Sequence, residues 1–263
     1  MYFCNMISKN LLKYVRSLEQ KKGRRQEGLF VAEGPKVVGD LMETMTPTRL
    51  IGMSEWFQQM HLTPRDTDVV VTDDELRKVS FLQHPQQVIA LFPIPNHQLS
   101  LPLQESEAAN ELFLALDDVQ DPGNLGTIIR IADWFGITTI FCSLNTADAY
   151  NPKVVQATMG SIARVKLIYT DLVQLFQNLP DTIPVYGTFL NGNNIYHEPL
   201  SNHGIIVMGN EGNGISPAVA AHINHRLLIP NYPEGRITAD SLNVAIATAI
   251  TCAEFRRCLT CSR

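Results

Sequence analysis

Apolar runs suited to buried strands alternate with segments of helical periodicity along residues 111–263. Short apolar runs bounded by turn residues predict strands, whereas apolar residues three or four positions apart predict helices. The expected strands are Leu112–Leu116, Thr138–Ser143, Ala163–Ile168, Val185–Leu190, Gly204–Met208 and His225–Ile229. The expected helices are Leu125–Phe135, Pro152–Met159, Asp171–Asn178, Pro217–His222 and Ser241–Cys258. This order predicts a parallel α/β sheet that is covered by helices on both faces.

The first part of the chain predicts a smaller, mixed α/β domain. Its expected helices are Lys9–Gln20 and Pro35–Glu43, with further polar helices between the later strands. Its expected strands are Leu29–Ala32, Arg49–Met53, Val69–Thr72 and Val88–Phe92. A stretch rich in proline and polar residues follows at Phe92–Asn110. We therefore expect a domain at residues 1–95, a linker at 96–110 and a second domain at 111–263.

The composition is that of an ordinary globular protein. The 263 residues are 45% hydrophobic, 18% charged and 8% aromatic, which excludes a disordered or low-complexity chain. The longest mostly apolar stretches, such as Ile137–Leu144 and Val244–Ile250, are far shorter than the roughly 20 residues of a membrane-spanning helix. The N-terminus has no basic segment followed by an apolar core, so no secretory signal is expected.

Charge is distributed unevenly along the chain. The net charge is −5, yet residues 1–36 carry +5 and the remainder carries −10. A basic N-terminal arm on an acidic body indicates a local contact with a polyanion, and the alternative is a solvated helix face. Four of the basic residues are close together, namely Lys21, Lys22, Arg24 and Arg25.

The cysteines and histidines do not indicate a metal site. Five cysteines are an odd number in a chain without an export signal, which predicts reduced thiols and a cytoplasmic location. Cys258 and Cys261 form a single CxxC, with no second pair to complete a zinc site. The seven histidines are scattered, so we expect no metal.

Three loops follow strands of the predicted parallel sheet, where ligands bind in such folds. The first runs from Asp117 to Asn124, and Asn124 is expected to be the N-cap of the next helix. Arg130 lies about one and a half turns inside that helix, between apolar neighbours. An arginine in this position either extends to solvent or is held there for a purpose.

The second loop contains three glycines, Gly209, Gly212 and Gly214. Glycines let a ligand approach the backbone, but this spacing is not the GxGxxG of dinucleotide folds, and no Walker lysine follows. Glu211 in the same loop disfavours a phosphate and suits a hydroxyl, an amine or a cation. The third loop leads to an Ala/Ile-rich helix, for which Asp240 or Ser241 is the expected cap.

Together and in this order, the three loops resemble the SpoU (TrmH-like) class of the SPOUT superfamily of RNA methyltransferases. DDVQDPGNLGTIIRIADWFGI resembles the first motif, IVMGNEGNGIS the second and LLIP…SLNVAIATAI the third. NPKVVQATMGSIARV is similar to the segment between motifs one and two, and the likeness spans Leu112–Phe255. LKYVRSLEQKKGRRQEGLFVAEGPKVV is similar to the L30e-like RNA-binding domain that precedes many members.

The resemblance implies a trefoil knot, which is rare among proteins, and S-adenosylmethionine as the cofactor. It also implies a homodimer whose active site combines both protomers. The activity implied is methylation of a ribose 2′-hydroxyl in structured RNA. The N-terminal domain favours ribosomal over transfer RNA. The residues implied to hold the cofactor are Thr188, Met208, Gly209, Gly212, Ile229 and Leu242.

The resemblance assigns the chemistry to five residues, namely Arg130, Asn124, Glu211, Ser241 and Asn243. A guanidinium stays protonated, so Arg130 is expected to position and stabilise the 2′-oxygen and the adjacent phosphate. Asn124 would position the ribose or phosphate, and the other three would orient Arg130, the ribose and the cofactor. From the residues alone, Asn124 and Ser241 are also credible helix caps, and Glu211 could complement a helix N-terminus.

Two features depart from the family pattern. The loop NYPEGRITAD is a few residues longer than usual, and Gln156 stands where an arginine is common. The alternatives are a tRNA 2′-O-methyltransferase and a non-catalytic RNA-binding or ribosome-assembly factor on the same scaffold. A nucleotide-dependent oxidoreductase is set aside because the first strand is not followed by GxGxxG.

Overall fold

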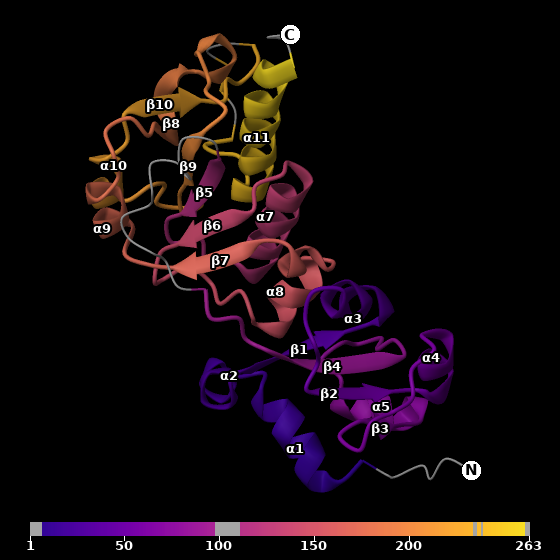
Figure 1. Cartoon of the computed structure of the whole chain (residues 1–263). Helices are drawn as coiled ribbons and strands as arrows, with labels where there is room; N and C mark the ends of the chain where they lie inside the picture. Colours follow the sequence, from indigo (N-terminus) through magenta and orange to yellow (C-terminus); the bar gives the residue numbers. More distant parts are fainter. Residues whose placement is uncertain (1–6, 98–110, 234–235, 238, 261–263) are drawn as a thin grey trace. The chain divides into compact units, whose positions relative to one another are not determined.

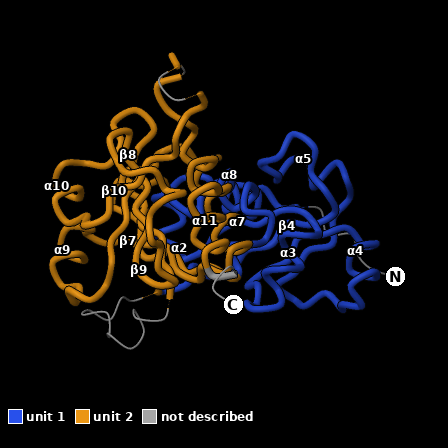
Figure 2. Tube along the Cα trace, turned by 90° about the horizontal axis from the view of Figure 1, so that it is seen from above, with its two compact units in different colours: residues 1–96, 148–163 blue, residues 97–147, 164–263 orange. Residues whose placement is uncertain are grey.

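The computed structural model describes residues 7–97, 111–233, 236–237 and 239–260. The chain folds into two compact units (Figure 2). Unit 1 contains residues 1–96 together with residues 148–163, and unit 2 contains residues 97–147 and 164–263. Unit 1 is therefore built from two segments that are far apart in sequence. Most of the predicted linker, residues 98–110, lies outside the described residues.

Unit 1 is built on a four-stranded sheet of order β1-β4-β2-β3. Its strands are β1 (Leu29–Glu33), β2 (Arg49–Gly52), β3 (Val69–Val70) and β4 (Val88–Pro93). Its N-terminal helices are α1 (Lys9–Ser17), α2 (Lys21–Glu27), α3 (Pro35–Met42), α4 (Ser54–Gln59) and α5 (Asp73–Val79). The second segment adds α8 (Pro152–Ala157) and the 3-10 turn η1 (Ser161–Ala163). The mixed α/β class predicted for this part is confirmed.

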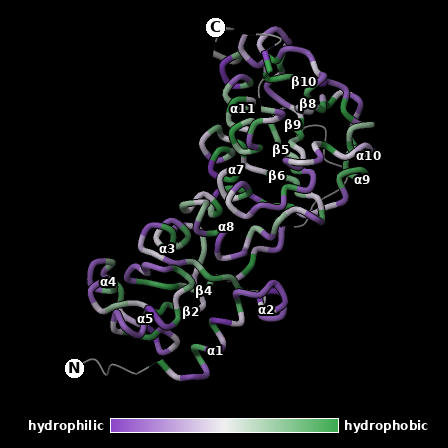
Figure 3. Tube along the Cα trace, turned by 180° about the vertical axis from the view of Figure 1, so that it is seen from behind, coloured by the Kyte–Doolittle hydropathy of each residue, from purple (hydrophilic) through white to green (hydrophobic). Residues whose placement is uncertain are grey.

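The predicted helix Lys9–Gln20 is shorter in the structure and is followed by a second helix. Helix α1 ends at Ser17, and α2 starts at Lys21. A Cβ atom on Gly23 would lie 2.1 Å from the carbonyl oxygen of Ser17, so only glycine permits this close approach. Gly28 then ends α2 in the left-handed conformation, at φ 65°. Helix α2 is hydrophilic throughout, as Figure 3 shows.

Unit 2 contains a six-stranded sheet of order β10-β8-β9-β5-β6-β7, in which every neighbouring pair is parallel. The strands are β5 (Leu112–Leu116), β6 (Thr139–Cys142), β7 (Lys166–Tyr169), β8 (Val185–Asn194), β9 (Gly204–Met208) and β10 (His225–Leu228). The predicted parallel sheet is confirmed. Strand β7 starts later than predicted because Ser161–Ala163 forms η1.

Helices cover both faces of this sheet (Figure 1). They are α7 (Pro122–Trp134), α9 (Leu172–Gln177), α10 (Pro217–Ala220) and α11 (Val244–Thr260), with the 3-10 turn η2 (Ile195–His197). Helices α7 and α11 pack against each other on one face, and α9 and α10 do so on the other. Strands β5, β6 and β9 are fully buried, as expected for the centre of a sheet covered on both faces. The trefoil knot stays a prediction.

The order of the strands fixes where a ligand can bind. The chain moves from β5 to β6 and β7 on one side, and later occupies the other side with β8, β9 and β10. Parallel sheets bind ligands beyond the carboxyl ends of their strands where the direction of winding changes, here between β5 and β9. The three motif loops follow β5, β9 and β10 and thus meet at this edge. In the described part of the chain, no helix is long and apolar enough to cross a membrane.

Candidate active site

Helix α7 starts earlier than predicted, and this changes the role of Asn124. The N-cap is Asp121, whose side chain accepts a 2.8 Å hydrogen bond from the Asn124 backbone N–H, and Pro122 occupies the first turn. The prediction that Asn124 caps this helix is therefore wrong. An Asp followed by Pro is a strong start signal for a helix. Because Asp121 caps the helix, the Asn124 side chain is available for other contacts.

The structure joins one residue from each of the three motifs. The Asn124 side-chain amide donates a hydrogen bond to Oε1 of Glu211. The Asn243 amide donates to Oδ1 of Asn124 at 3.0 Å and to Oε1 of Glu211 at 3.3 Å. Among the described residues, Oε2 of Glu211 accepts no hydrogen bond. Asn124, Glu211 and Asn243 thus form an amide–carboxylate cluster with one carboxylate oxygen available.

Asn243 also begins helix α11. Its Oδ1 accepts hydrogen bonds from the backbone N–H groups of Ala245 at 3.0 Å and Ile246 at 3.3 Å. The prediction of Asp240 or Ser241 as the cap is therefore wrong. The Asn243 oxygen caps the helix and its amide group donates to the cluster, so this side chain fixes the start of α11 relative to Asn124 and Glu211. Ser241 is exposed and lines the cavity described below.

The glycine loop after β9 is held by side chains that the sequence analysis did not single out. Asn210 and Gly214 exchange two backbone hydrogen bonds, of 2.9 and 2.8 Å. The Asn210 side chain accepts from the N–H groups of Gly212 and Asn213 and donates to the carbonyl of Asp118 at 2.8 Å. Buried Asp117 accepts from the Ser216 N–H at 2.7 Å. An asparagine beside glycines is a turn signal, which could have indicated Asn210.

A cavity of about 440 Å³ lies between the loops, within the size range of small-molecule sites. All six residues predicted to hold the cofactor line it: Thr188, Met208, Gly209, Gly212, Ile229 and Leu242. Glu211, Asp240 and Ser241 line it as well. A smaller cavity of about 250 Å³ is lined by residues that include Asp121, Asn210 and Glu211. Glu211 is therefore at the border of two cavities.

The lining of the larger cavity fits S-adenosylmethionine better than a nucleotide phosphate. Its walls combine apolar side chains with the backbone of the glycine loop, and no Lys or Arg is among the residues that line it. A Cβ atom on Gly209 would lie 2.3 Å from the backbone of Gly214, so the loop packs tightly there. The carboxylates of Glu211 and Asp240 complement a positively charged ligand. Among the described residues, no group of side chains could hold a metal ion.

The structure does not bring Arg130 into the amide–carboxylate cluster of its own chain. Arg130 is exposed, six positions after Asn124 on α7. Six helical positions correspond to about 9 Å along the axis and about 240° of rotation, so the two residues occupy different faces. Arg130 shares its exposed face with Thr127 and Trp134, and the Trp134 side chain is 85% exposed.

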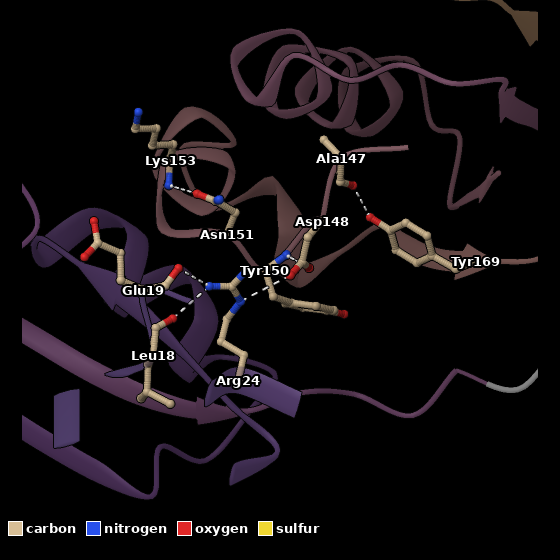
Figure 4. A network of polar contacts seen from close by, with 9 residues as sticks. All are labelled: Leu18, Glu19, Arg24, Ala147, Asp148, Tyr150, Asn151, Lys153 and Tyr169. Carbon is tan, nitrogen blue, oxygen red and sulfur yellow. Dashed lines mark hydrogen bonds and ion pairs between the residues drawn. The ribbon is translucent and has the colours of Figure 1, made fainter. Parts of the chain in front are cut away.

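The predicted RNA-binding residues of α2 divide into two kinds. Lys21, Lys22 and Arg25 are exposed, whereas Arg24 is only 2% exposed. Its guanidinium donates to the carbonyls of Leu18 and Glu19, at 2.8 and 2.7 Å, and to the Asp148 carboxylate at 2.6 Å (Figure 4). The structure thus differs from the prediction for Arg24, because a guanidinium buried among these partners is not available to RNA.

Comparisons with known proteins agree with these two units. A parallel α/β domain with three convergent motif loops, preceded by a smaller α/β domain, has the architecture of an RNA methyltransferase with a substrate-binding domain. Residues 111–253 match the SpoU rRNA Methylase family, and residues 9–90 match the MRM3-like substrate binding domain. The chain belongs to the SpoU rRNA methylase family.

Relatives with known names or structures match over nearly the whole chain. The 23S rRNA (guanosine(2553)-2′-O)-methyltransferase RlmP of Bacillus subtilis is 30% identical, over 89% of this chain and 91% of its own. A structure from Porphyromonas gingivalis, described as a TrmH-family RNA methyltransferase, is 41% identical with a TM-score of 0.84, covering 96% of this chain and 99% of its own. An AdoMet-bound rRNA methyltransferase from Sinorhizobium meliloti is 29% identical with a TM-score of 0.81, covering 95% of both chains.

Proposed function

We propose that this protein transfers a methyl group from S-adenosylmethionine to a ribose 2′-hydroxyl of ribosomal RNA. The observation that carries the proposal is the meeting of Asn124, Glu211 and Asn243 at the border of the cofactor-sized cavity. The names of the relatives support it, since RlmP acts on a guanosine 2′-oxygen of 23S rRNA and the Sinorhizobium meliloti structure holds AdoMet.

The larger cavity would hold the cofactor, and the smaller one would receive the ribose. When bound, S-adenosylmethionine supplies a methyl group on a positively charged sulfur. Glu211 lines both cavities, and its Oε2 would accept a hydrogen bond from the ribose hydroxyl. Asn124 and Asn243 hold this carboxylate through Oε1, and Ser241 would contact the cofactor side of the site. Their contribution is to fix the hydroxyl in line with the methyl group.

Arg130 would act in the site of a second copy of the chain. Arg130 is exposed on α7, and α7 packs against α11. The exposed residues of α11 include Ile246 and Ala253. On these two helices Trp134 and Ile246 are 85% and 53% exposed, and exposed large apolar side chains are typical of a protein interface. A symmetric dimer formed through these two helices would offer each Arg130 to the partner as a fixed positive charge for the developing 2′-oxyanion and the adjacent phosphate.

Unit 1 would bind the RNA and unit 2 would carry the catalytic site, so the methyltransferase domain predicted at residues 111–263 would lend residues 148–163 to the RNA-binding unit. The match of residues 9–90 to a substrate binding domain supports this division of roles. The exposed Lys21, Lys22 and Arg25 supply positive charge for the phosphates. We place the protein in the cytoplasm, which the buried, reduced thiols of Cys142 and Cys252 support.

The test is transfer of labelled methyl from S-adenosylmethionine to RNA from a strain that lacks this gene. Naked ribosomal RNA, ribosomal subunits and transfer RNA are offered separately, and the product is digested to nucleosides. We expect label in one 2′-O-methylnucleoside of ribosomal RNA. Label in transfer RNA alone would correct the substrate. No label in any fraction, from a protein that binds the cofactor in calorimetry, would support a non-catalytic RNA-binding factor instead.

A further inference from the structure

The segment Asp148–Ala163 lies in the chain between the first two methyltransferase motifs, yet it folds as part of unit 1. It contacts the corner where α2 leads into β1. Two side-chain contacts made by the start of this segment define the attachment, one polar and one aromatic. They hold the start of the segment against α2 and β1.

The polar contact is the ion pair between Arg24 and Asp148. Arg24 donates to Oδ2 of Asp148 from Nη2 at 2.6 Å and from Nε at 3.2 Å (Figure 4). Its Nη1 donates to the carbonyls of Leu18 and Glu19, which follow the last turn of α1. One buried guanidinium therefore joins the end of α1, helix α2 and the start of the second segment.

The aromatic contact lies two residues further along. The ring of Tyr150 packs on the ring of Phe30 in β1, with 5.0 Å between the centroids. The Tyr150 N–H also donates to Oδ1 of Asp148 at 3.0 Å. Helix α8, which follows directly, packs along β1. The segment is thus held on the strand that continues from α2, and its position is set by buried contacts.

Lys153 lies in the first turn of α8, close to these two contacts in the chain. Asn151 caps the helix by accepting from the Lys153 N–H at 2.9 Å. The Lys153 side chain is exposed, as are those of Lys21, Lys22 and Arg25, the neighbours of Arg24 on α2. Within the described residues, none of these four side chains forms an ion pair. In contrast, Lys36, Arg65 and Arg77 of the same unit are paired with carboxylates.

We propose that Lys153 joins Lys21, Lys22 and Arg25 in one surface that binds RNA phosphates, with the Arg24–Asp148 pair as its internal support. The inference rests on the proposed function, because it needs RNA as the substrate. Contacts to phosphates position the RNA and do not read its sequence. Each of the four cations, from two segments of the chain, would therefore add to the affinity for the RNA backbone. The nearby carboxylates of Glu19 and Glu27 leave the surface with a net positive charge.

The experiment uses the full-length protein and ribosomal RNA from a strain that lacks this gene. Filter binding is measured over a series of salt concentrations for wild type, Lys153→Glu, Lys153→Arg and Lys22→Glu. Lys36→Glu is the matched control, because Lys36 is an exposed lysine of the same unit paired with Asp40. We expect Lys153→Glu to weaken binding about tenfold at low salt and to flatten the salt dependence, as Lys22→Glu does, while Lys153→Arg binds normally.

A second readout separates RNA binding from the chemical step. Lys153→Glu should raise the KM for RNA with kcat, cofactor affinity and thermal stability unchanged. If Lys153→Glu binds RNA as well as Lys36→Glu while wild type methylates RNA, the inference is overturned and the proposed function stands. If wild type neither binds nor methylates any RNA, both are overturned.

Discussion

The side-chain amide of Asn243 donates a 3.0 Å hydrogen bond to the side-chain oxygen of Asn124, which lies 119 residues earlier in the chain. The oxygen of the same Asn243 side chain caps α11 through Ala245 and Ile246. One residue therefore links the third motif to the first and starts the C-terminal helix. The two roles use different atoms, so substitutions can separate them.

Asn243→Asp should keep the fold and lose the activity. The new carboxylate still accepts from the two helix N–H groups, and aspartate is as good a cap as asparagine. It cannot donate to Asn124, and it adds a second negative charge beside Glu211. We expect the melting temperature to change little and kcat to fall about 100-fold, on the scale of losing one oriented donor in an active site.

Asn243→Ala is the companion variant. It loses the cap as well, which costs about 1 kcal/mol of stability. Circular dichroism melting and methyl-transfer assays on both variants separate the two roles. A fully active Asn243→Asp protein would show that the cluster does not contribute to the reaction.

Two glycines of the second motif make a matched pair for cofactor binding. A Cβ atom on Gly209 would lie 2.3 Å from the backbone of Gly214 and Ile215, so Gly209→Ala must displace the loop. The nearest atom to a Cβ atom on Gly212 is Oδ1 of Asn210 at 3.5 Å, an ordinary contact. We expect Gly209→Ala to weaken S-adenosylmethionine binding at least tenfold, or about 1.4 kcal/mol, and Gly212→Ala to change it less than threefold. Calorimetry measures both, and equal losses would contradict this account.

Periodicity was sufficient to predict the parallel sheet, because its central strands β5, β6 and β9 are fully buried and appear as short apolar runs. All six of its strands were predicted, with ends that differ by a few residues. The six residues assigned to the cofactor by resemblance also line one cavity. A site lined by backbone atoms can be predicted from the sequence because the glycines that let a ligand approach the backbone are visible there.

The features that the sequence did not reveal, such as the burial of Arg24, depend on contacts between residues far apart in the chain. Nothing near Arg24 distinguishes it from Arg25, yet the partner Asp148, 124 positions away, buries one and leaves the other exposed. Helix α2 was missed because its close approach to α1 depends on Gly23, which interrupts a helical pattern when read locally. Cap assignments failed where several candidates were adjacent, as with Asp240, Ser241 and Asn243.

Arg130 and Glu211 should complement each other between subunits. If Arg130 serves the site of the partner, mixing Arg130→Ala with Glu211→Gln subunits produces heterodimers in which one site has both residues intact. Random exchange of equal amounts should then restore about a quarter of the wild-type rate, although each variant alone is inactive. The rate is measured after refolding the mixture, with each refolded variant as a control. No recovery from a confirmed heterodimer would place Arg130 in the site of its own chain.

Substituting Arg24 should lower the stability of the fold, whereas substituting the adjacent Arg25 should weaken RNA binding. Arg24→Met leaves the Asp148 carboxylate without its guanidinium partner. It also removes the hydrogen-bond donor of the Leu18 and Glu19 carbonyls. Removing one partner of a largely buried pair costs about 3 kcal/mol. Arg25→Met changes an exposed side chain and should alter stability by less than about 0.5 kcal/mol while weakening RNA binding. Denaturant unfolding and filter binding give both quantities, and a stable Arg24→Met protein would contradict the role of Arg24 as internal support.

Two glutamates of unit 1 should make opposite contributions to the pH dependence of stability. Burial raises the pKa of Glu33, although hydrogen bonds from Ser80 and Phe81 oppose the shift. A raised pKa means that the folded state binds the proton more tightly than the unfolded state. Wild type should therefore lose stability relative to Glu33→Gln as the pH rises from the unfolded pKa of about 4.3 through the raised pKa.

Glu75 provides the control with the opposite sign. The backbone N–H of Thr72 donates to it at 2.9 Å in a capping box and, with the N–H of Ile7, lowers its pKa. Its stabilising contribution is present above the unfolded pKa of about 4.3 and is lost as the pH falls through the folded value. Wild type should thus gain stability relative to Glu75→Gln as the pH rises from the folded pKa of Glu75 to about 4.3. This window lies below the one in which wild type loses stability relative to Glu33→Gln. Urea unfolding of the three proteins between about pH 2.5 and pH 8 covers both windows. Slopes of the same sign would contradict the assignment of Glu33 to a desolvated site and Glu75 to a helix cap.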